Sequence, residues 1–126
     1  MTLVHGIDII EIDRIRNVVN QYGSRFYNRI YSTLEIEYCN GNPSKLATRF
    51  AAKEAVMKAL GTGIRGVSWK EIEVLRQPGQ APQIRLHGRA SQRASSLGIT
   101  EMALSLSHSD NFAIASVVAE SKTNNY

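Results

Sequence analysis

The chain has 126 residues, a formal net charge of +4, 43% apolar residues and 21% charged residues. This is ordinary usage for a globular domain, and it excludes a disordered tail or a fibrous repeat. The length excludes a multidomain protein and allows one modest core, so we expect a substrate to bind in a groove or between subunits.

The sequence carries no signal for export or for a disulfide framework. No apolar run reaches the roughly 20 residues that cross a bilayer, and residues 1–6 lack the basic start and apolar stretch of a signal peptide. We therefore expect a cytoplasmic protein with no membrane partner. The single cysteine, Cys39, cannot form an internal disulfide, and three histidines do not suggest a zinc site.

Positive charge is concentrated in the first half of the chain. Between Arg14 and Arg65 there are nine Lys and Arg residues and three acidic residues. Such asymmetry favours an anionic partner, which could be nucleic acid, a phosphorylated cofactor or an acidic protein. A basic face that is simply solvated is an equally good interpretation of the charge alone.

The first predicted elements are a strand and an amphipathic helix. Residues 3–12 are rich in β-branched side chains, and we expect a strand there that ends near Asp8. Apolar residues then recur at helical spacing as far as Gly23, which predicts a helix with Arg14 on its outer face. A further helical pattern covers residues 26–38.

The strongest helical signal is in the middle of the chain. Asn42 is placed to cap a helix that begins at Pro43 and stops at Gly61. Apolar residues cover nearly every side of this helix, which predicts that it lies at the centre of the fold. The glycine-rich segment 61–66 is predicted as a flexible loop.

The second half of the chain is predicted to be mainly β structure. A hairpin, a short helix and two final strands are expected at residues 67–75 with 83–87, 88–97, 102–107 and 112–119. Together the elements predict one α+β domain over residues 1–120, with a polar tail at 121–126 that frays.

Two acidic residues lie in apolar segments, where burying an unpaired carboxylate costs free energy. Asp8 is set among isoleucines of the first strand, and Glu54 lies in the alanine-rich central helix. If the two converge, a divalent cation would neutralise them, and oxygen-only ligands favour Mg²⁺. The simpler alternatives are a helix cap or an arginine partner for Asp8, and an i,i+4 ion pair with Lys58 for Glu54.

Two further residues could contact a phosphate. Lys58 lies one turn after Glu54 and could neutralise a phosphate held at such a metal, although a helical lysine is more often simply solvated. His108 ends a strand between two serines and could bind a phosphate or a ribose, or be an ordinary polar strand end. The sequence has no phosphate loop, dinucleotide fingerprint or nucleophile triad.

Three segments together resemble a known enzyme family: GIDIIEI at 6–12, RFAAKEAVMKALGTG at 49–63 and LSLSHSDNFAIASVV at 104–118. The pattern F-x-x-K-E-A-x-x-K, with G-x-D before it and S-x-S-H after it, is similar to the holo-acyl-carrier-protein synthases, the small bacterial type of 4′-phosphopantetheinyl transferase. The segment GQAP at 79–82 departs from the family, which commonly has one residue between this glycine and proline.

The resemblance implies a fold and a reaction. It implies a small mixed domain of helices and antiparallel sheet that forms a trimer, with active sites at the subunit interfaces. The implied reaction transfers 4′-phosphopantetheine from coenzyme A to a serine of apo-acyl carrier protein in fatty acid biosynthesis, and releases adenosine 3′,5′-bisphosphate. Mg²⁺ would be bound by Asp8 and Glu54, and Lys58 would assist cleavage of the pyrophosphate. Whether a metal-bound water or Glu54 takes the serine proton is left open.

By the same resemblance, other residues would bind the two substrates. Arg14 and Arg25 match positions that dock the acidic carrier protein. The residues that would bind coenzyme A are Arg49, Lys58, Gly61, His108 and Ser109.

The sequence gives less support to two other functions. A basic nucleic-acid-binding module is disfavoured because no RNA- or DNA-binding motif appears and aromatic residues are only 7%. A non-catalytic relative that only binds carrier proteins is disfavoured because Asp8, Glu54 and Lys58 are all present.

Overall fold

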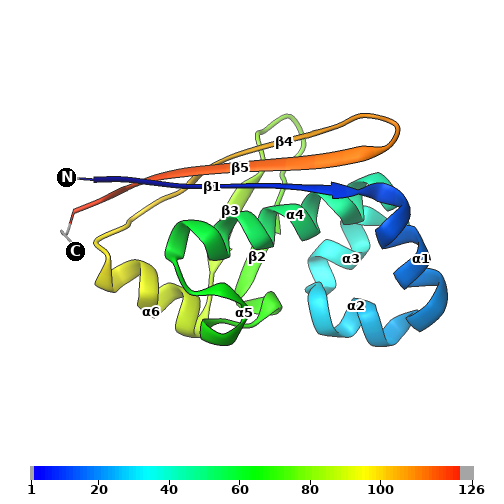
Figure 1. The fold of residues 1–126 in the computed structure, drawn as a ribbon, viewed down its shortest axis with the longest axis horizontal. Helices are drawn as coiled ribbons and strands as arrows, with labels where there is room; N and C mark the ends of the chain where they lie inside the picture. Colours follow the sequence, from blue (N-terminus) through cyan, green and yellow to red (C-terminus); the bar gives the residue numbers. More distant parts are fainter. Residues whose placement is uncertain (1, 123–126) are drawn as a thin grey trace.

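Helices and two antiparallel sheets make up the fold, which we describe for residues 2–122 of a computed structural model (Figure 1). Along the chain, the elements are β1 (Thr2–Glu11), α1 (Ile12–Tyr22), α2 (Ser24–Ile30), α3 (Thr33–Cys39), α4 (Pro43–Leu60), α5 (Gly63–Gly66), the 3-10 turn η1 (Trp69–Glu71), β2 (Ile72–Leu75), β3 (Gln83–Leu86), α6 (Gly88–Ser96), β4 (Ala103–His108) and β5 (Phe112–Ser121). None of the described helices is both long and apolar enough to cross a membrane.

The larger sheet has the strand order β1-β5-β4, and β2 pairs with β3 in a separate hairpin. β1 and β5 pair along their whole length, from Thr2 opposite Ser121 to Glu11 opposite Phe112. The prediction that the first strand ends near Asp8 was therefore wrong, because the partner strand continues past it. β5 reaches Ser121, one residue into the predicted tail, and residues 123–126 lie outside the described part of the chain.

Helix α4 lies against one face of the larger sheet, and the β2–β3 hairpin runs behind it in the view of Figure 1 and contacts it through β2. Its predicted bounds are confirmed: the Asn42 side chain accepts a hydrogen bond from the Lys45 N–H at 3.1 Å, and Gly61 ends the helix with φ 71°. The buried apolar residues form one core around it, as the all-round apolar pattern predicted.

The smaller helices gather at the two ends of α4, with α1–α3 at one end and α6 at the other (Figure 1). The helical pattern predicted over 26–38 is broken because Ser32 and Glu35 form a capping box that starts α3. The predicted loop 61–66 contains the short helix α5, and the predicted strand 67–75 begins as η1.

The sheet face turned away from α4 is apolar and uncovered. Residues alternate along β1, so that Gly6 and Ile10 are buried while Leu3, Ile7 and Ile9 are 63%, 56% and 62% exposed. Phe112 and Val118 of β5 are also large exposed apolar residues. An apolar sheet face of this kind is typical of an interface.

Candidate active site

Asp8, Glu54 and Lys58 meet between β1 and α4. The Lys58 Nζ lies 3.1 Å from Asp8 Oδ1 and also donates to the Ile7 carbonyl oxygen at 3.0 Å. Glu54 lies one turn earlier on α4, close enough to Asp8 for that carboxylate to raise the pKa of Glu54. The sequence left open whether these residues converge, and the structure brings all three together.

Gly6 explains how β1 comes close enough to α4 for this contact. A Cβ atom at this position would overlap the backbone carbonyl oxygen of Ala55. Asp8 follows two residues later on the same face of the strand and therefore also points toward the helix. Glycine is thus required here for close backbone approach rather than for its conformation.

The carboxylates have unequal environments. Burial raises the pKa of Glu54 above its ordinary value, the Asp8 carboxylate raises it further, and the positive charges of Lys58 and Arg14 oppose this shift. The Asp8 side chain is 11% exposed, whereas that of Lys58 is 56% exposed. The site therefore pairs two partly buried acids with a cation that can move toward solvent.

The donor set fits a magnesium ion. Asp8 and Glu54 offer carboxylate oxygens only, and Mg²⁺ binds one or two carboxylates while waters and substrate phosphates complete its shell. Within residues 2–122 there is no group of three or more His, Cys, Asp and Glu side chains that could hold a metal. A metal at this site would take its further ligands from water and substrate phosphates.

A pocket of about 340 Å³ opens beside these residues. It is lined by Glu54, Met57, Lys58, Gly61, Gly63, Ile64 and Trp69. Trp69 was not predicted as a site residue because its segment reads as a strand, and the only available signal was that it is the single tryptophan of the chain. The pocket combines charged groups at one side with apolar walls.

Arg49 is buried on α4 with part of its guanidinium unpaired. Its Nη1 donates to Thr48 Oγ1 at 3.1 Å, and the group stacks on the Tyr38 ring, 4.6 Å from the centroid. Its Nε and Nη2 have no hydrogen-bond partner, although the residue is only 4% exposed. A buried arginine with free donors is unusual and suits an anionic ligand.

His108 and Ser109 lie in the turn between β4 and β5. Ser109 Oγ accepts hydrogen bonds from the Asn111 and Phe112 N–H groups, at 3.3 and 3.1 Å, and so closes this turn. Among the described residues, no hydrogen bond or ion pair joins His108 or Ser109 to the Asp8 cluster. By strand register, His108 lies across β5 from Ile10, which is two residues from Asp8 on β1.

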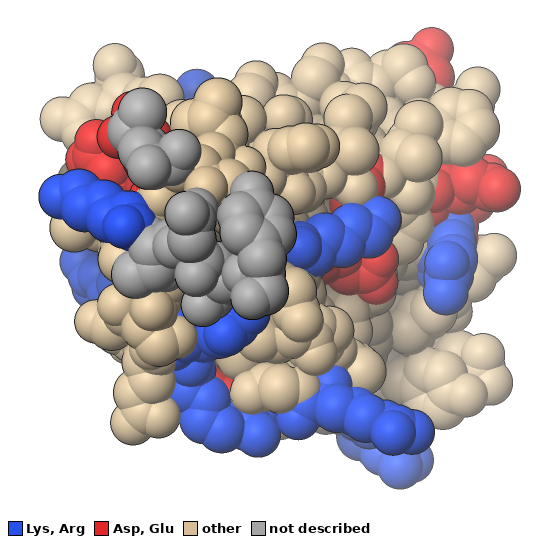
Figure 2. Space-filling view, turned by 60° about the vertical axis from the view of Figure 1, so that its left-hand side comes forward, with Lys and Arg blue, Asp and Glu red and all other residues tan. Residues whose placement is uncertain are grey.

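Arg14 and Arg25 are both exposed at the α1–α2 end. A hollow of about 280 Å³ there is lined by Val18, Tyr22, Arg25, Phe26 and Arg29. Our sequence analysis gave Arg29 no role. Figure 2 shows the other end of the molecule, where α6 and the chain termini lie, and there Lys and Arg gather along the lower edge of the face.

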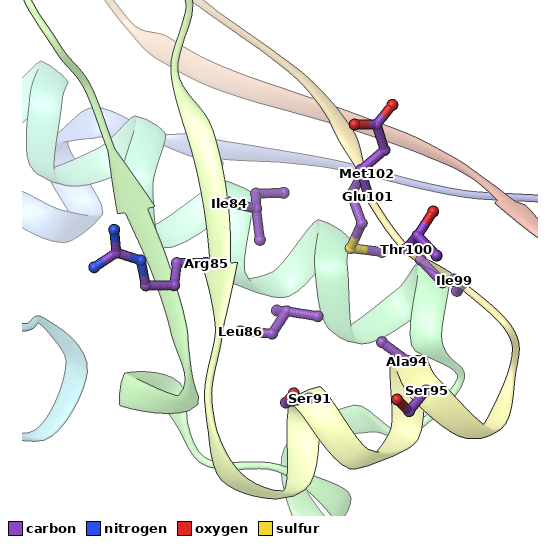
Figure 3. A pocket seen from close by; sticks show the side chains of 10 residues that line it. All are labelled: Ile84, Arg85, Leu86, Ser91, Ala94, Ser95, Ile99, Thr100, Glu101 and Met102. Carbon is purple, nitrogen blue, oxygen red and sulfur yellow. The ribbon is translucent and has the colours of Figure 1, made fainter.

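Two other features lie outside this site. A larger hollow of about 470 Å³ is enclosed by β3, α6 and the segment before β4, where Ile84, Leu86 and Met102 point into it (Figure 3). None of the predicted site residues lines it. Cys39 is 1% exposed, and burial raises the pKa of its thiol to about 11, so it is poorly suited to react.

Comparison with known proteins decides the family. Residues 5–117 match the family model of the 4′-phosphopantetheinyl transferase superfamily. The chain belongs to this family. A holo-[acyl-carrier-protein] synthase of Koribacter versatilis is 48% identical over 124 residues, 95% of this chain and 99% of the relative. One of Herpetosiphon aurantiacus is 48% identical over 123 residues, 92% of this chain and 97% of the relative.

The fold of the phosphopantetheinyl transferases is confirmed by a solved structure. The crystal structure of Helicobacter pylori holo-[acyl-carrier-protein] synthase in complex with coenzyme A matches this chain with a TM-score of 0.84 and 37% identity. The match covers 92% of this chain and 99% of that chain. The resemblance inferred from three segments, and the predicted α+β fold of helices and antiparallel sheet, are both confirmed.

Proposed function

We propose that this chain transfers the 4′-phosphopantetheine group of coenzyme A to a serine hydroxyl of apo-acyl carrier protein. The other product would be adenosine 3′,5′-bisphosphate, and the reaction would require Mg²⁺. The observation that carries the proposal is the meeting of Asp8, Glu54 and Lys58 beside a pocket, in a chain whose relatives are holo-[acyl-carrier-protein] synthases. A cytoplasmic location and a role in fatty acid biosynthesis are part of the proposal.

Asp8 and Glu54 would hold the metal ion. When bound, Mg²⁺ would neutralise charge on the diphosphate of coenzyme A and polarise its oxygens. The serine oxygen forms a bond to the phosphorus that carries pantetheine, and the phosphoanhydride bond to adenosine bisphosphate breaks. The serine proton passes to water or to the Glu54 carboxylate.

Lys58 would act on the leaving group. Lys58 lines the pocket and its side chain is 56% exposed, so its ammonium can reach a phosphate oxygen outside the cluster. Phosphoryl transfer depends mainly on positioning and on neutralisation of developing negative charge. A lysine beside two metal-binding carboxylates supplies that charge without a covalent nucleophile on the protein.

The pocket and Arg49 suit the two halves of coenzyme A. The apolar walls formed by Met57, Ile64 and Trp69 suit the pantetheine arm, and Gly61 leaves room where the pocket meets the end of α4. The unpaired guanidinium donors of Arg49 suit a phosphate of the nucleotide half.

The α1–α2 end suits the carrier protein. The hollow beside Arg25 and Arg29 has an apolar floor that includes Val18 and Phe26, so it could take an acidic amphipathic segment. Arg14 would add to this surface, and it lies near enough to Glu54 to influence the pKa of that residue. A docked carrier protein would thus deliver its serine close to the metal site.

We also propose that the protein is a homotrimer. The apolar face of the larger sheet, with Ile7 and Ile9 exposed, would be covered by neighbouring copies. His108 and Ser109 of one copy could then reach the coenzyme A bound by another, which would complete the set of substrate-binding residues.

Mass spectrometry of the carrier protein tests the function directly. Purified apo-acyl carrier protein is incubated with this protein, coenzyme A and Mg²⁺, and we expect its mass to increase by one phosphopantetheine. A carrier protein in which the acceptor serine is replaced by alanine should stay unmodified. The proposal would be wrong if wild-type carrier protein also kept its mass.

A further inference from the structure

A buried ion pair lies directly behind the pocket that the proposed function assigns to coenzyme A. Lys53 precedes Glu54 on α4, and Glu35 lies on α3. Both side chains are completely buried, and Lys53 Nζ lies 2.9 Å from Glu35 Oε1. The proposed chemistry uses neither residue.

Lys53 ties α4 to the turn that carries Trp69. Its Nζ donates to the carbonyl oxygens of Trp69 at 3.1 Å and of Ile72 at 2.5 Å. Together with Glu35, these partners use all three ammonium protons. Both ends of η1 are therefore held to one side chain of α4.

Glu35 extends the same connection to α3 and β2. Its Oε1 accepts from the Ser32 N–H at 2.8 Å, and its Oε2 accepts from the Val74 N–H at 2.8 Å. The pair thus joins α3, α4 and β2.

Of the residues held by Lys53 and Glu35, Trp69 is the one that lines the pocket. Its ring stacks on Phe50 of α4, with 4.8 Å between centroids, and it lines the pocket together with Glu54 and Lys58. Lys53 and Glu54 are consecutive residues of one rigid helix. Fixing the Trp69 carbonyl to Lys53 therefore fixes the apolar wall relative to the carboxylate that faces it.

Stability alone explains the pair poorly. Replacing a buried ion pair by apolar residues of similar volume is often neutral or stabilising, because desolvation offsets the attraction. Apolar side chains would not fix the orientation of the neighbouring backbone. Only hydrogen-bond donors and acceptors bind particular backbone N–H and carbonyl groups. We propose that Glu35 and Lys53 are positioning residues that hold the Trp69 wall of the coenzyme A pocket.

The test replaces both charges together, so that no unpaired charge stays buried. The variant is Glu35→Gln/Lys53→Met. Its tryptophan fluorescence reports the surroundings of the Trp69 ring, because Trp69 is the only tryptophan of the chain. We expect a folded protein with red-shifted, more readily quenched emission. Because misplacement of a substrate-binding wall weakens binding, we expect the KM for coenzyme A to rise about tenfold, with the KM for carrier protein changed less than about twofold.

A control variant distinguishes a displaced Trp69 from a general loss of stability of the fold. Ile99→Ala truncates a buried residue that lines the other hollow, so it should lower the melting temperature without changing Trp69 emission or the KM for coenzyme A.

Two results would overturn the proposal. One is a folded double variant with wild-type emission and wild-type KM for coenzyme A. The other is an unfolded double variant, which would mean that the pair supports the fold as a whole. If wild-type protein lacked transferase activity, the proposed function would fail, while the emission comparison would still decide whether the pair holds Trp69.

Discussion

At the scale of single residues, Asp8 and Arg14 connect the two halves of the proposed reaction. Asp8 belongs to the proposed metal site, and the charge of Arg14 lowers the pKa of Glu54 in the same site while Arg14 itself is exposed on α1. The surface proposed for the carrier protein is therefore continuous with the site that would modify it.

Replacement of Arg14 tests this connection. An exposed charge at the rim of an interface contributes mainly to association, so Arg14→Ala should raise the KM for carrier protein about three- to tenfold and make the rate less sensitive to salt. The KM for coenzyme A should stay near its wild-type value. Lys122→Ala, at the other end of the molecule, should change neither constant. An unchanged KM for carrier protein in Arg14→Ala would argue against the docking role.

At the scale of elements, the packing of β1 on α4 determines the site. Gly6→Ala would force the strand away from the Ala55 carbonyl oxygen and separate Asp8 from Glu54. Overpacking of this kind costs about 1–3 kcal/mol, and we expect a comparable loss of unfolding free energy together with a large loss of turnover. Gly79→Asn is the control, because nothing lies near Gly79 and asparagine tolerates its positive φ. Full activity in Gly6→Ala would contradict this account.

Glu71 gives the fold a measurable dependence on pH. Its carboxylate accepts hydrogen bonds from Ser68 and from the Arg89 and Ala90 N–H groups that begin α6. Partial burial alone would raise the pKa of Glu71, but these hydrogen bonds lower it to about 2, from an ordinary value of 4.5. The stabilisation is therefore complete above pH 4.5 and is lost as the pH falls toward 2.

Urea unfolding at two pH values tests this contribution. Glu71→Gln should lower the unfolding free energy by about 1–2 kcal/mol at pH 7, as loss of a helix cap does, and by less at pH 3. Glu101→Gln, an exposed acid before β4, is the control and should have little effect at either pH. A Glu71→Gln effect of equal size at both pH values would contradict the low pKa.

The bounds of a helix or strand could be predicted from the sequence where the residues that set them lie beside those bounds. The bounds of α4 follow from Asn42, Pro43 and Gly61, each of which acts on the backbone beside it. The capping box that starts α3 was also present in the sequence as S-x-x-E, but the apolar periodicity of 26–38 masked it. The length of β1 was not predictable, since it depends on pairing with β5 at the opposite end of the chain.

The site was predictable only in part for the same reason. Spacing cannot bring Asp8 and Glu54 together, and the resemblance of three segments supplied that expectation. Trp69 and Lys53 were missed because their roles depend on contacts between α4 and η1, which no local pattern encodes. The sequence therefore predicted the charged residues of the candidate site better than the walls around them.

At the scale of the whole molecule, the exposed apolar sheet face predicts assembly. Val118→Asp would place a charge on that face, at the far end of β5 from Phe112. We expect wild-type protein to sediment as a trimer and the variant as a smaller species with reduced transfer to carrier protein. Glu120→Asp, which keeps the charge of an exposed residue nearby, should stay trimeric. A wild-type monomer with full activity would contradict the proposed assembly.

The central claim is that Asp8 and Glu54 jointly hold a magnesium ion on which transfer depends. Phosphopantetheine addition to apo-acyl carrier protein is followed by mass spectrometry across a Mg²⁺ series for wild type, Asp8→Asn and Glu54→Gln. Since loss of several kcal/mol of charge stabilisation is expected, each variant should be slower by at least about 100-fold while keeping the wild-type fold by circular dichroism. Near-normal, Mg²⁺-dependent rates in either variant would contradict the claim.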